Sequence, residues 1–110
     1  VLIVPADNAR VYGEATTRTR ATGWNIELDP LVAGAFGNVV REQRIKSGLA
    51  QEKLALLAGI ERAHLGKIER GESLPTLPLI LRLSNVLEVK AAALIAQMEE
   101  RLDDAKVKAM

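Results

Sequence analysis

A short stretch in the middle of the chain carries the residues whose types and spacing could contact nucleic acid. They recur at positions i, i+1, i+4, i+5 and i+8, a spacing that places them on one side of a helix. These residues are Arg62, Ala63, Gly66, Lys67 and Arg70. Three are cations that can reach base edges or phosphates, and two are small enough to let a helix approach closely. Because an α-helix fits the major groove of B-DNA, the pattern predicts a helix that reads base pairs.

Each of these positions suggests a particular contact. Arg62 lies at the start of the helix, where its planar fork matches O6 and N7 of guanine, and Lys67 can make a less specific contact of the same kind. Ala63 suits a thymine methyl group, and Arg70, near the helix end, suits a phosphate. Gly66 serves close approach, either to DNA or to a crossing helix. The alternative is a solvated helix face without a ligand, which is the more common meaning of such cations outside a larger motif.

The elements that must position this face are two short helices joined by a glycine. Residues 51–58 predict the first helix, Gly59 suits the left-handed turn that ends it, and residues 62–70 predict the second. The inward side chains are expected to be Leu54, Leu57 and Ala58 in the first helix, and Leu65 and Ile68 in the second. Two helices, a glycine turn and a cationic outer face are typical of a helix-turn-helix.

Further positions agree with a known pattern, in the same order along the chain. They are Arg41 and Arg44, Gly48 to Ala55, Gly59, Leu65 with Ile68 to Gly71, and Pro75 to Leu77. With these residues the segment from Phe36 to about Leu94 resembles the phage-repressor family (Cro and lambda-repressor, XRE type), over about half of the chain. The resemblance implies an all-α, five-helix, lambda-repressor-like helix-turn-helix domain, here residues 30–90, that binds double-stranded DNA.

The resemblance also assigns roles to residues outside the cationic face. Arg44 is expected to pair with Glu69 inside the domain, so both are structural. Gln51 is expected at a helix N-terminus beside a DNA phosphate, where its amide and the unpaired helix N–H groups bind the anion together. Two positions depart from the family pattern, because Ala50 and Glu61 stand where the family usually has a capping Ser, Thr or Asp. A carboxylate at residue 61 would repel phosphate or accept a hydrogen bond from cytosine, and so help to exclude wrong sites.

Two more helices are predicted around this motif. Asp29 and Pro30 suit the N-cap and first position of a helix that runs to Ser47, where Gly48 closes it. Thr76 can cap a leucine-rich helix that follows the motif. The core is expected to include Phe36, Val39 and Val40 from the first of these helices, and Leu77, Ile80, Leu81, Leu83, Val86 and Leu87 from the second.

Residues 91–110 predict a long C-terminal helix with an apolar seam. The seam repeats at alternating spacings of four and three, and consists of Ala91, Ile95, Met98, Leu102, Ala105 and Ala109. One amphipathic helix cannot bury such a stripe alone. It either docks on its own domain or, as the preferred interpretation, pairs with a second copy through Ile95, Met98, Leu102 and Ala105. A homodimer would present two reading helices ~34 Å apart, to a near-palindrome with half-sites ~10 bp apart.

Residues 1–29 form an N-terminal extension outside the resemblance. Three interpretations stay open for it: a partly ordered tail, an arm that carries Arg10, Arg18 and Arg20 to DNA, or a short strand at Val1–Val4 that pairs with its copy in a dimer. The same segment, taken as residues 1–30, also leaves room for a protein partner.

Composition narrows the class of protein. The net charge of the 110 residues is only +1, yet residues 41–70 hold seven basic and four acidic residues, so the positive excess lies on the predicted motif. Cysteine is absent and His64 is the single histidine, which leaves no thiolate chemistry and no metal cluster. No cofactor and no enzymatic activity are expected. No signal peptide and no membrane span are expected either, and the predicted location is the cytoplasm.

These observations predict a sequence-specific transcriptional regulator that acts by occupying operator DNA, with repression expected rather than activation. An alternative of another class is the antitoxin of a toxin–antitoxin pair, which would bind a protein through residues 1–30 as well as DNA. Co-purification with such a partner would separate the two.

Overall fold

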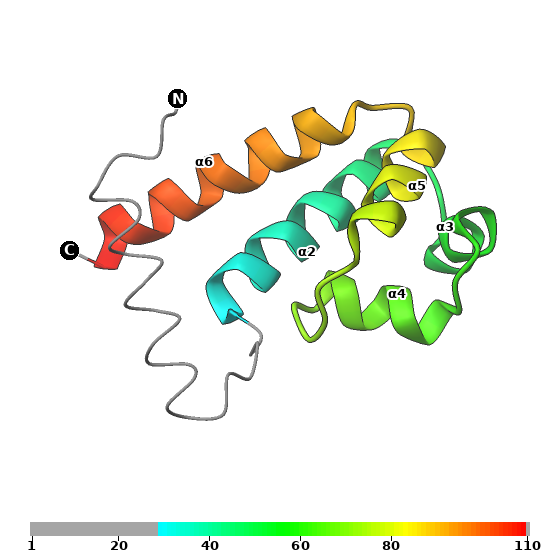
Figure 1. Ribbon diagram of the computed structural model, residues 1–110, viewed down its shortest axis with the longest axis horizontal. Helices are drawn as coiled ribbons and strands as arrows, with labels where there is room; N and C mark the ends of the chain where they lie inside the picture. Colours follow the sequence, from blue (N-terminus) through cyan, green and yellow to red (C-terminus); the bar gives the residue numbers. More distant parts are fainter. Residues whose placement is uncertain (1–28, 110) are drawn as a thin grey trace.

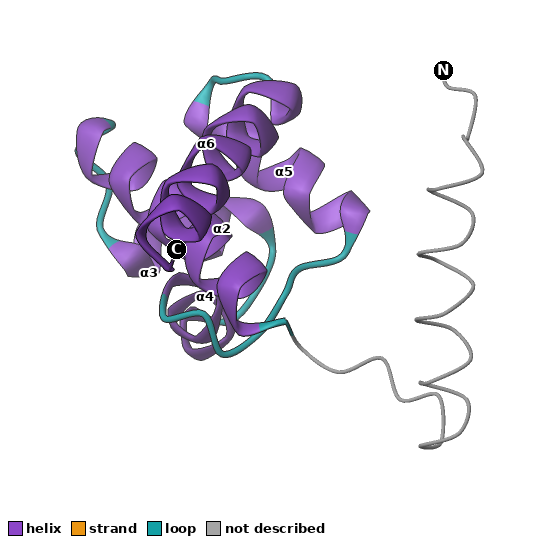
Figure 2. Ribbon diagram, turned by 90° about the vertical axis from the view of Figure 1, so that its left-hand side faces the viewer, coloured by secondary structure: helices purple, strands orange, loops and turns teal. Residues whose placement is uncertain are grey.

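The computed structural model describes residues 29–109, with side chains described as far as residue 104. This part of the chain folds into helices alone: α2 (Pro30–Lys46), α3 (Gln51–Ala58), α4 (Arg62–Glu69), α5 (Leu77–Leu87) and α6 (Ala91–Ala109) (Figures 1 and 2). The all-α, five-helix prediction is confirmed. The arm, strand and protein-partner hypotheses for the N-terminal extension fall outside the described residues.

The helix ends follow the capping chemistry of the sequence. Asp29 accepts a hydrogen bond from the Leu31 N–H at 3.0 Å, and Thr76 caps α5 in the same way. Neither Ala50, which precedes α3, nor Glu61, which precedes α4, makes a side-chain cap. The two helices of the central motif therefore begin with N–H groups that no capping side chain satisfies.

The core lies among the five helices and takes side chains from each of them. Its largest fully buried side chains are Phe36, Val39, Val40, Leu54, Leu65, Ile68, Leu83 and Leu94. Three leucines expected inside are exposed instead: Leu57 on α3, and Leu77 and Leu81 on α5, which are 68% and 53% exposed. On α5, Leu79 is buried in place of Leu77 and Leu81, because the helix is rotated so that residues 79, 83 and 87 face inward.

The C-terminal helix runs back along α2, which lies beside it in Figure 1. Leu94 is buried, and Ile95 and Met98 pack against the same core. A polar contact also joins the two helices: the Gln43 amide of α2 donates to Gln97 of α6 at 3.1 Å. The seam that was preferred as a dimer interface is thus covered in part by its own domain, which was the alternative.

The far end of the seam is also turned toward α2. Arg101 donates to both carboxylate oxygens of Glu42, at 2.8 and 2.6 Å, and this bond lowers the pKa of the Glu42 carboxyl from its ordinary value. Leu102 lines a hollow with residues of the first turns of α2, among them Pro30 and Leu31. The side chain of Ala105, the last predicted dimer residue, lies outside the described side chains.

Gly37 sets the distance between α2 and the end of α4. A Cβ at Gly37 would overlap the carbonyl oxygen of Ile68 and lie 2.7 Å from that of Glu69. Gly34, one turn earlier in the same helix, has nothing within 4 Å of an added Cβ. The two glycines are therefore a matched pair, one needed for packing and one that is not.

We expect Gly37→Ala to destabilise the protein by ~1 kcal/mol or more, because the clash is with backbone and forces the helices apart. Gly34→Ala should instead stabilise it by ~0.5–1 kcal/mol, since alanine favours helix over glycine. Urea unfolding of both variants measures the difference. Equal effects of the two substitutions would contradict the close approach of α2 and α4.

Candidate nucleic-acid interface

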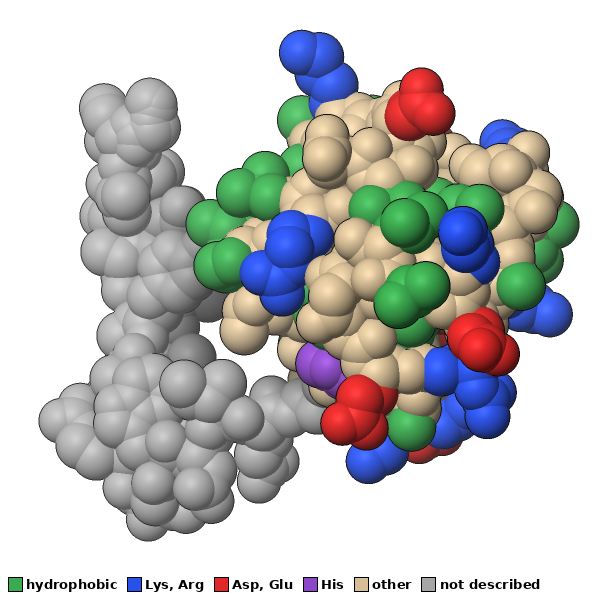
Figure 3. Space-filling view, turned by 90° about the vertical axis from the view of Figure 1, so that its right-hand side faces the viewer, with side chains coloured by type: hydrophobic (Ala, Val, Ile, Leu, Met, Phe, Trp, Pro, Cys, Tyr) green, Lys and Arg blue, Asp and Glu red, His purple; other side chains and the backbone are tan. Residues whose placement is uncertain are grey.

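The helix α4 is amphipathic in the sense that the sequence predicted. Leu65 and Ile68 are fully buried, whereas Arg62, Ala63 and Lys67 are exposed on the opposite side. Figure 3, which faces α3, α4 and α5, shows Lys, Arg and acidic side chains gathered along the lower edge of the molecule, where α4 runs. Buried leucine and isoleucine thus hold the helix, and its outer side is left to solvent.

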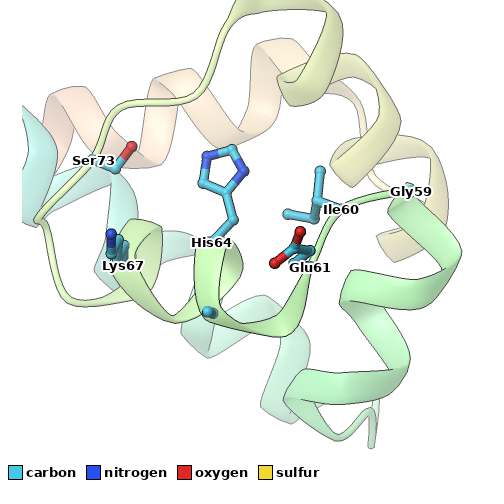
Figure 4. A pocket seen from close by; sticks show the side chains of 7 residues that line it. Gly59, Ile60, Glu61, His64, Lys67 and Ser73 are labelled. Carbon is cyan, nitrogen blue, oxygen red and sulfur yellow. The ribbon is translucent and has the colours of Figure 1, made fainter.

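A hollow on one side of α4 brings Ala63 and Lys67 together with residues that precede and follow the helix. Its lining consists of Gly59, Ile60, Glu61, Ala63, His64, Lys67 and Ser73. In Figure 4 the His64 imidazole rises from α4 between Ile60 and Ser73, with Lys67 beside Ser73. Ser73 was not predicted as a site residue, because only the turn after α4 brings it here.

Arg62 belongs to a second hollow, between α3 and α4. The residues that line it are Glu52, Ala55, Leu56, Ile60, Glu61 and Arg62. Two carboxylates and an exposed leucine therefore line the same hollow as the arginine. Ile60 and Glu61 line both hollows, so the N-terminus of α4, with Arg62 and Ala63, stands as a ridge between them.

Gly66 is not part of the open face, which corrects the expectation that it shares the surface of Lys67. The residue is buried, because two side chains cover it. A Cβ at this position would lie 3.0 Å from Nη1 of Arg70 and 3.6 Å from Oε1 of Gln51. The glycine leaves room for these side chains to lie close to α4.

A buried ion pair links α2 to α4. Nε of Arg44 donates to Oε2 of Glu69 at 2.7 Å, and Nη2 donates to Oε1 at 3.1 Å. The side chains are 13% and 3% exposed. Nη1 of Arg44 also donates to the Leu49 carbonyl at 2.9 Å, so the arginine bonds the loop before α3 as well. The pair expected inside the domain is present in the structure.

Gln51 has a structural role in addition to its expected phosphate contact. Its Nε2 donates to Oε1 of Glu69 at 3.0 Å. The amide at the start of α3 is thus tied to the carboxylate that Arg44 also holds, and the bond fixes the first turn of α3 against the end of α4. The expected contact between Gln51 and a DNA phosphate stays a prediction, because Glu69 accepts only one of the two amide hydrogens.

Arg70 is also held by a carboxylate, on the surface. Its Nε and Nη2 donate to the two oxygens of Glu72, at 2.7 and 3.3 Å. This hydrogen bonding lowers the pKa of the Glu72 carboxyl and raises the pKa of the Arg70 guanidinium. Glu72 was not predicted as a partner of Arg70, although an acidic residue two positions after a cation was a visible signal.

Two short helices around Gly59, with a buried side on each and cations on the outer side of the second, define a helix-turn-helix DNA-binding domain. The chain belongs to the XRE-type helix-turn-helix family, since the family model described as Helix-turn-helix (HTH_3) matches residues 40–94. The described part of the chain contains no helix long and apolar enough to cross a membrane.

Similar proteins agree with this family. The chain is 32% identical over 68 residues to the SPbeta prophage-derived uncharacterized HTH-type transcriptional regulator YonR of Bacillus subtilis (strain 168). The aligned residues are 62% of this chain and 63% of YonR. It is 36% identical over 53 residues to the uncharacterized HTH-type transcriptional regulator YgzD of the same organism, covering 48% of this chain and 80% of YgzD. This chain therefore spans less than two thirds of YonR.

Solved structures share the fold. The restriction-modification controller protein C.AhdI from Aeromonas hydrophila is 39% identical, with a TM-score of 0.55 over 56% of this chain and 94% of C.AhdI. The clp gene regulator ClgR from Corynebacterium glutamicum has a TM-score of 0.69 over 73% of this chain and 85% of its own, at 20% identity. The second likeness concerns the fold alone.

Proposed function

We propose that this protein represses transcription by occupying a near-palindromic operator as a homodimer, with α4 in the major groove. The observation that carries the proposal is the exposed side of α4, where Arg62, Ala63 and Lys67 face solvent while Leu65 and Ile68 anchor the helix. The transcriptional regulators among its relatives support the same function. Repression follows from occupancy alone, since a bound protein excludes other proteins from the same DNA.

The ridge at the start of α4 is the part that we assign to base recognition. Arg62 donates to O6 and N7 of a guanine, Ala63 contacts a thymine methyl group, and Lys67 reads a second guanine less strictly. Glu61 stands beside Arg62 in the same hollow, where it can accept only from a donor such as N4 of cytosine. A carboxylate at this point would therefore penalise sequences that place an acceptor opposite it.

Two further residues are assigned to the DNA backbone. Arg70 suits a phosphate at the end of α4. Gln51 still has a hydrogen to donate, because an amide NH₂ carries two and Glu69 accepts one of them. Since Ala50 gives α3 no side-chain cap, the first N–H groups of this helix are also open to the same anion. Gln51 thus links a phosphate contact to the buried pair of Arg44 and Glu69.

The homodimer follows from the way such domains read two half-sites. Ile95, Met98 and Leu102 are half-buried, so a second copy can cover only the part of the seam that α2 leaves open. A small interface of this kind gives a weak dimer in solution, and two adjacent half-sites then hold both copies together on DNA. We therefore propose a dimer whose assembly the operator completes.

Selection of binding sites from random duplex DNA, with the mass of the purified complex, tests the proposal. We expect enrichment of an inverted repeat whose half-site centres are ~10 bp apart, and two protein copies on each duplex. Without DNA, the average molecular mass of the protein should rise with its concentration, because a weak dimer forms only in part. Failure to enrich any sequence would refute sequence-specific binding, and one copy per selected duplex would refute the homodimer.

A further inference from the structure

The surface pair of Arg70 and Glu72 distinguishes Arg70, the C-cap residue of α4, from the cations within that helix. Within residues 29–104, Arg62 and Lys67 take part in no ion pair, whereas Arg70 gives two N–H groups to one carboxylate. The two side chains are 58% and 52% exposed, so both are open to solvent beside the C-terminal end of α4. The guanidinium is also folded back over Gly66, with Nη1 3.0 Å from the position of an added Cβ.

The backbone turn after α4 places Glu72 beside Arg70. Gly71 has a φ of 76°, the left-handed conformation that ends helices with a characteristic pair of bonds. The Gly71 N–H donates to the Ile68 carbonyl at 3.1 Å, and the Glu72 N–H donates to the Lys67 carbonyl at 2.8 Å. The turn that closes α4 therefore carries a carboxylate back beside the last cation of the helix.

We propose that Glu72 sets the affinity for DNA by holding Arg70 and competing with phosphate for its guanidinium. This inference rests on the proposed function, because it requires α4 to face DNA. A phosphate must either displace the carboxylate or bind the remaining N–H groups with Glu72 next to it. In the first case the ion pair with Glu72 is lost when the phosphate binds, and in the second the carboxylate repels the phosphate, so the net gain from Arg70 is reduced in both.

The competition has a consequence for salt dependence. The number of phosphates that a protein neutralises sets the slope of log affinity against log salt, at ~0.9 per phosphate on duplex DNA. While Glu72 balances Arg70, this arginine contributes little to the slope. Glu72→Gln removes the charge, keeps the shape of the side chain, and should release a full cation to the DNA.

The test is a double-mutant cycle of Glu72→Gln and Arg70→Ala, with a fluorescent mixed-sequence duplex of ~20 bp as the probe. We expect Glu72→Gln to tighten binding ~3- to 10-fold at low salt and to steepen the salt slope by up to ~0.9. Arg70→Ala should weaken the Glu72→Gln protein more than it weakens the original protein. Glu99→Gln, the same charge change on the exposed side of α6, should alter neither quantity.

Two outcomes would overturn the inference. If Glu72→Gln tightened binding equally with and without Arg70, Glu72 would act by simple repulsion of DNA. If Glu72→Gln weakened binding, the carboxylate would orient Arg70 for its phosphate. Both positions are exposed, so unchanged melting temperatures would show that every variant is folded. Lack of binding by the original protein to this duplex and to every duplex selected from random DNA would instead refute the proposed function, which separates the two failures.

Discussion

Replacing Arg44 with alanine should destabilise the protein by ~3–5 kcal/mol, because the substitution leaves the Glu69 carboxylate buried with Gln51 as its remaining donor. Glu69 is 3% exposed, so its charge depends on donors that the protein supplies. The Leu49 carbonyl loses its donor at the same time. For a domain of this size, each kcal/mol lowers the melting temperature by ~4–8 °C. Thermal and urea unfolding would measure the effect.

A matched variant separates the buried charge from the volume of the two side chains. Arg44→Met combined with Glu69→Leu removes both charges and fills similar space, and we expect it to recover most of the lost stability. The double variant also gives a result if Arg44→Ala alone does not fold. A loss below ~1 kcal/mol for Arg44→Ala would mean that the pair is not desolvated. A double variant as unstable as Arg44→Ala would mean that packing, and not charge, explains the loss.

The sequence allowed the helices and the central pair to be predicted because their causes are local or repeated in the family. Asp29 and Thr76 mark helix starts, because their side-chain oxygens accept hydrogen bonds from N–H groups of the first turn. Gly59 marks the turn of the motif, and it has a φ of 78° in the structure. Arg44 and Glu69 are far apart in the chain, and only the family resemblance indicated that they meet.

Other features depend on the packing of several helices, and periodicity does not report it. Leu81 and Leu83 are equally hydrophobic, yet Leu81 is exposed and Leu83 is buried, because the rotation of α5 follows from its contacts with α3 and α6. The seam of α6 has the same spacing whether it meets α2 or a second copy. Gly66 has no side chain to suggest that Gln51 and Arg70 would cover it.

The polar partners were the hardest to predict. The family resemblance placed Gln51 beside a DNA phosphate, but it did not indicate that the Gln51 amide also donates to a carboxylate of α4. Similarly, Arg70 was treated as a free cation, although Glu72 follows two residues later. Where a cation or amide has a carboxylate within reach, its availability to a ligand is a question of competition, and residue type alone does not decide it.

Arg62→Ala should weaken binding to the selected operator by ~1–3 kcal/mol, on the order of tenfold to a hundredfold, while binding to unrelated duplexes falls much less. The reason is that a bidentate contact to guanine depends on one base, whereas a charge near phosphate does not. The preference for guanine at one position of each half-site should also disappear. Because Arg62 is exposed and forms no ion pair within the described residues, folding should be unaffected.

The measurement is the dissociation constant for the selected duplex, for the same duplex with that guanine replaced, and for an unrelated sequence. Lys90→Ala serves as the control, because it removes an exposed cation directly before α6. The first turns of α6 lie at the top of Figure 1, and α4 lies near the bottom. If Arg62 reads the guanine, the original protein should bind the altered duplex more weakly than the selected one, and Arg62→Ala should bind both equally. An equal loss on all three duplexes would instead assign Arg62 to the backbone, and the reading of sequence would then fall to Ala63 and Lys67.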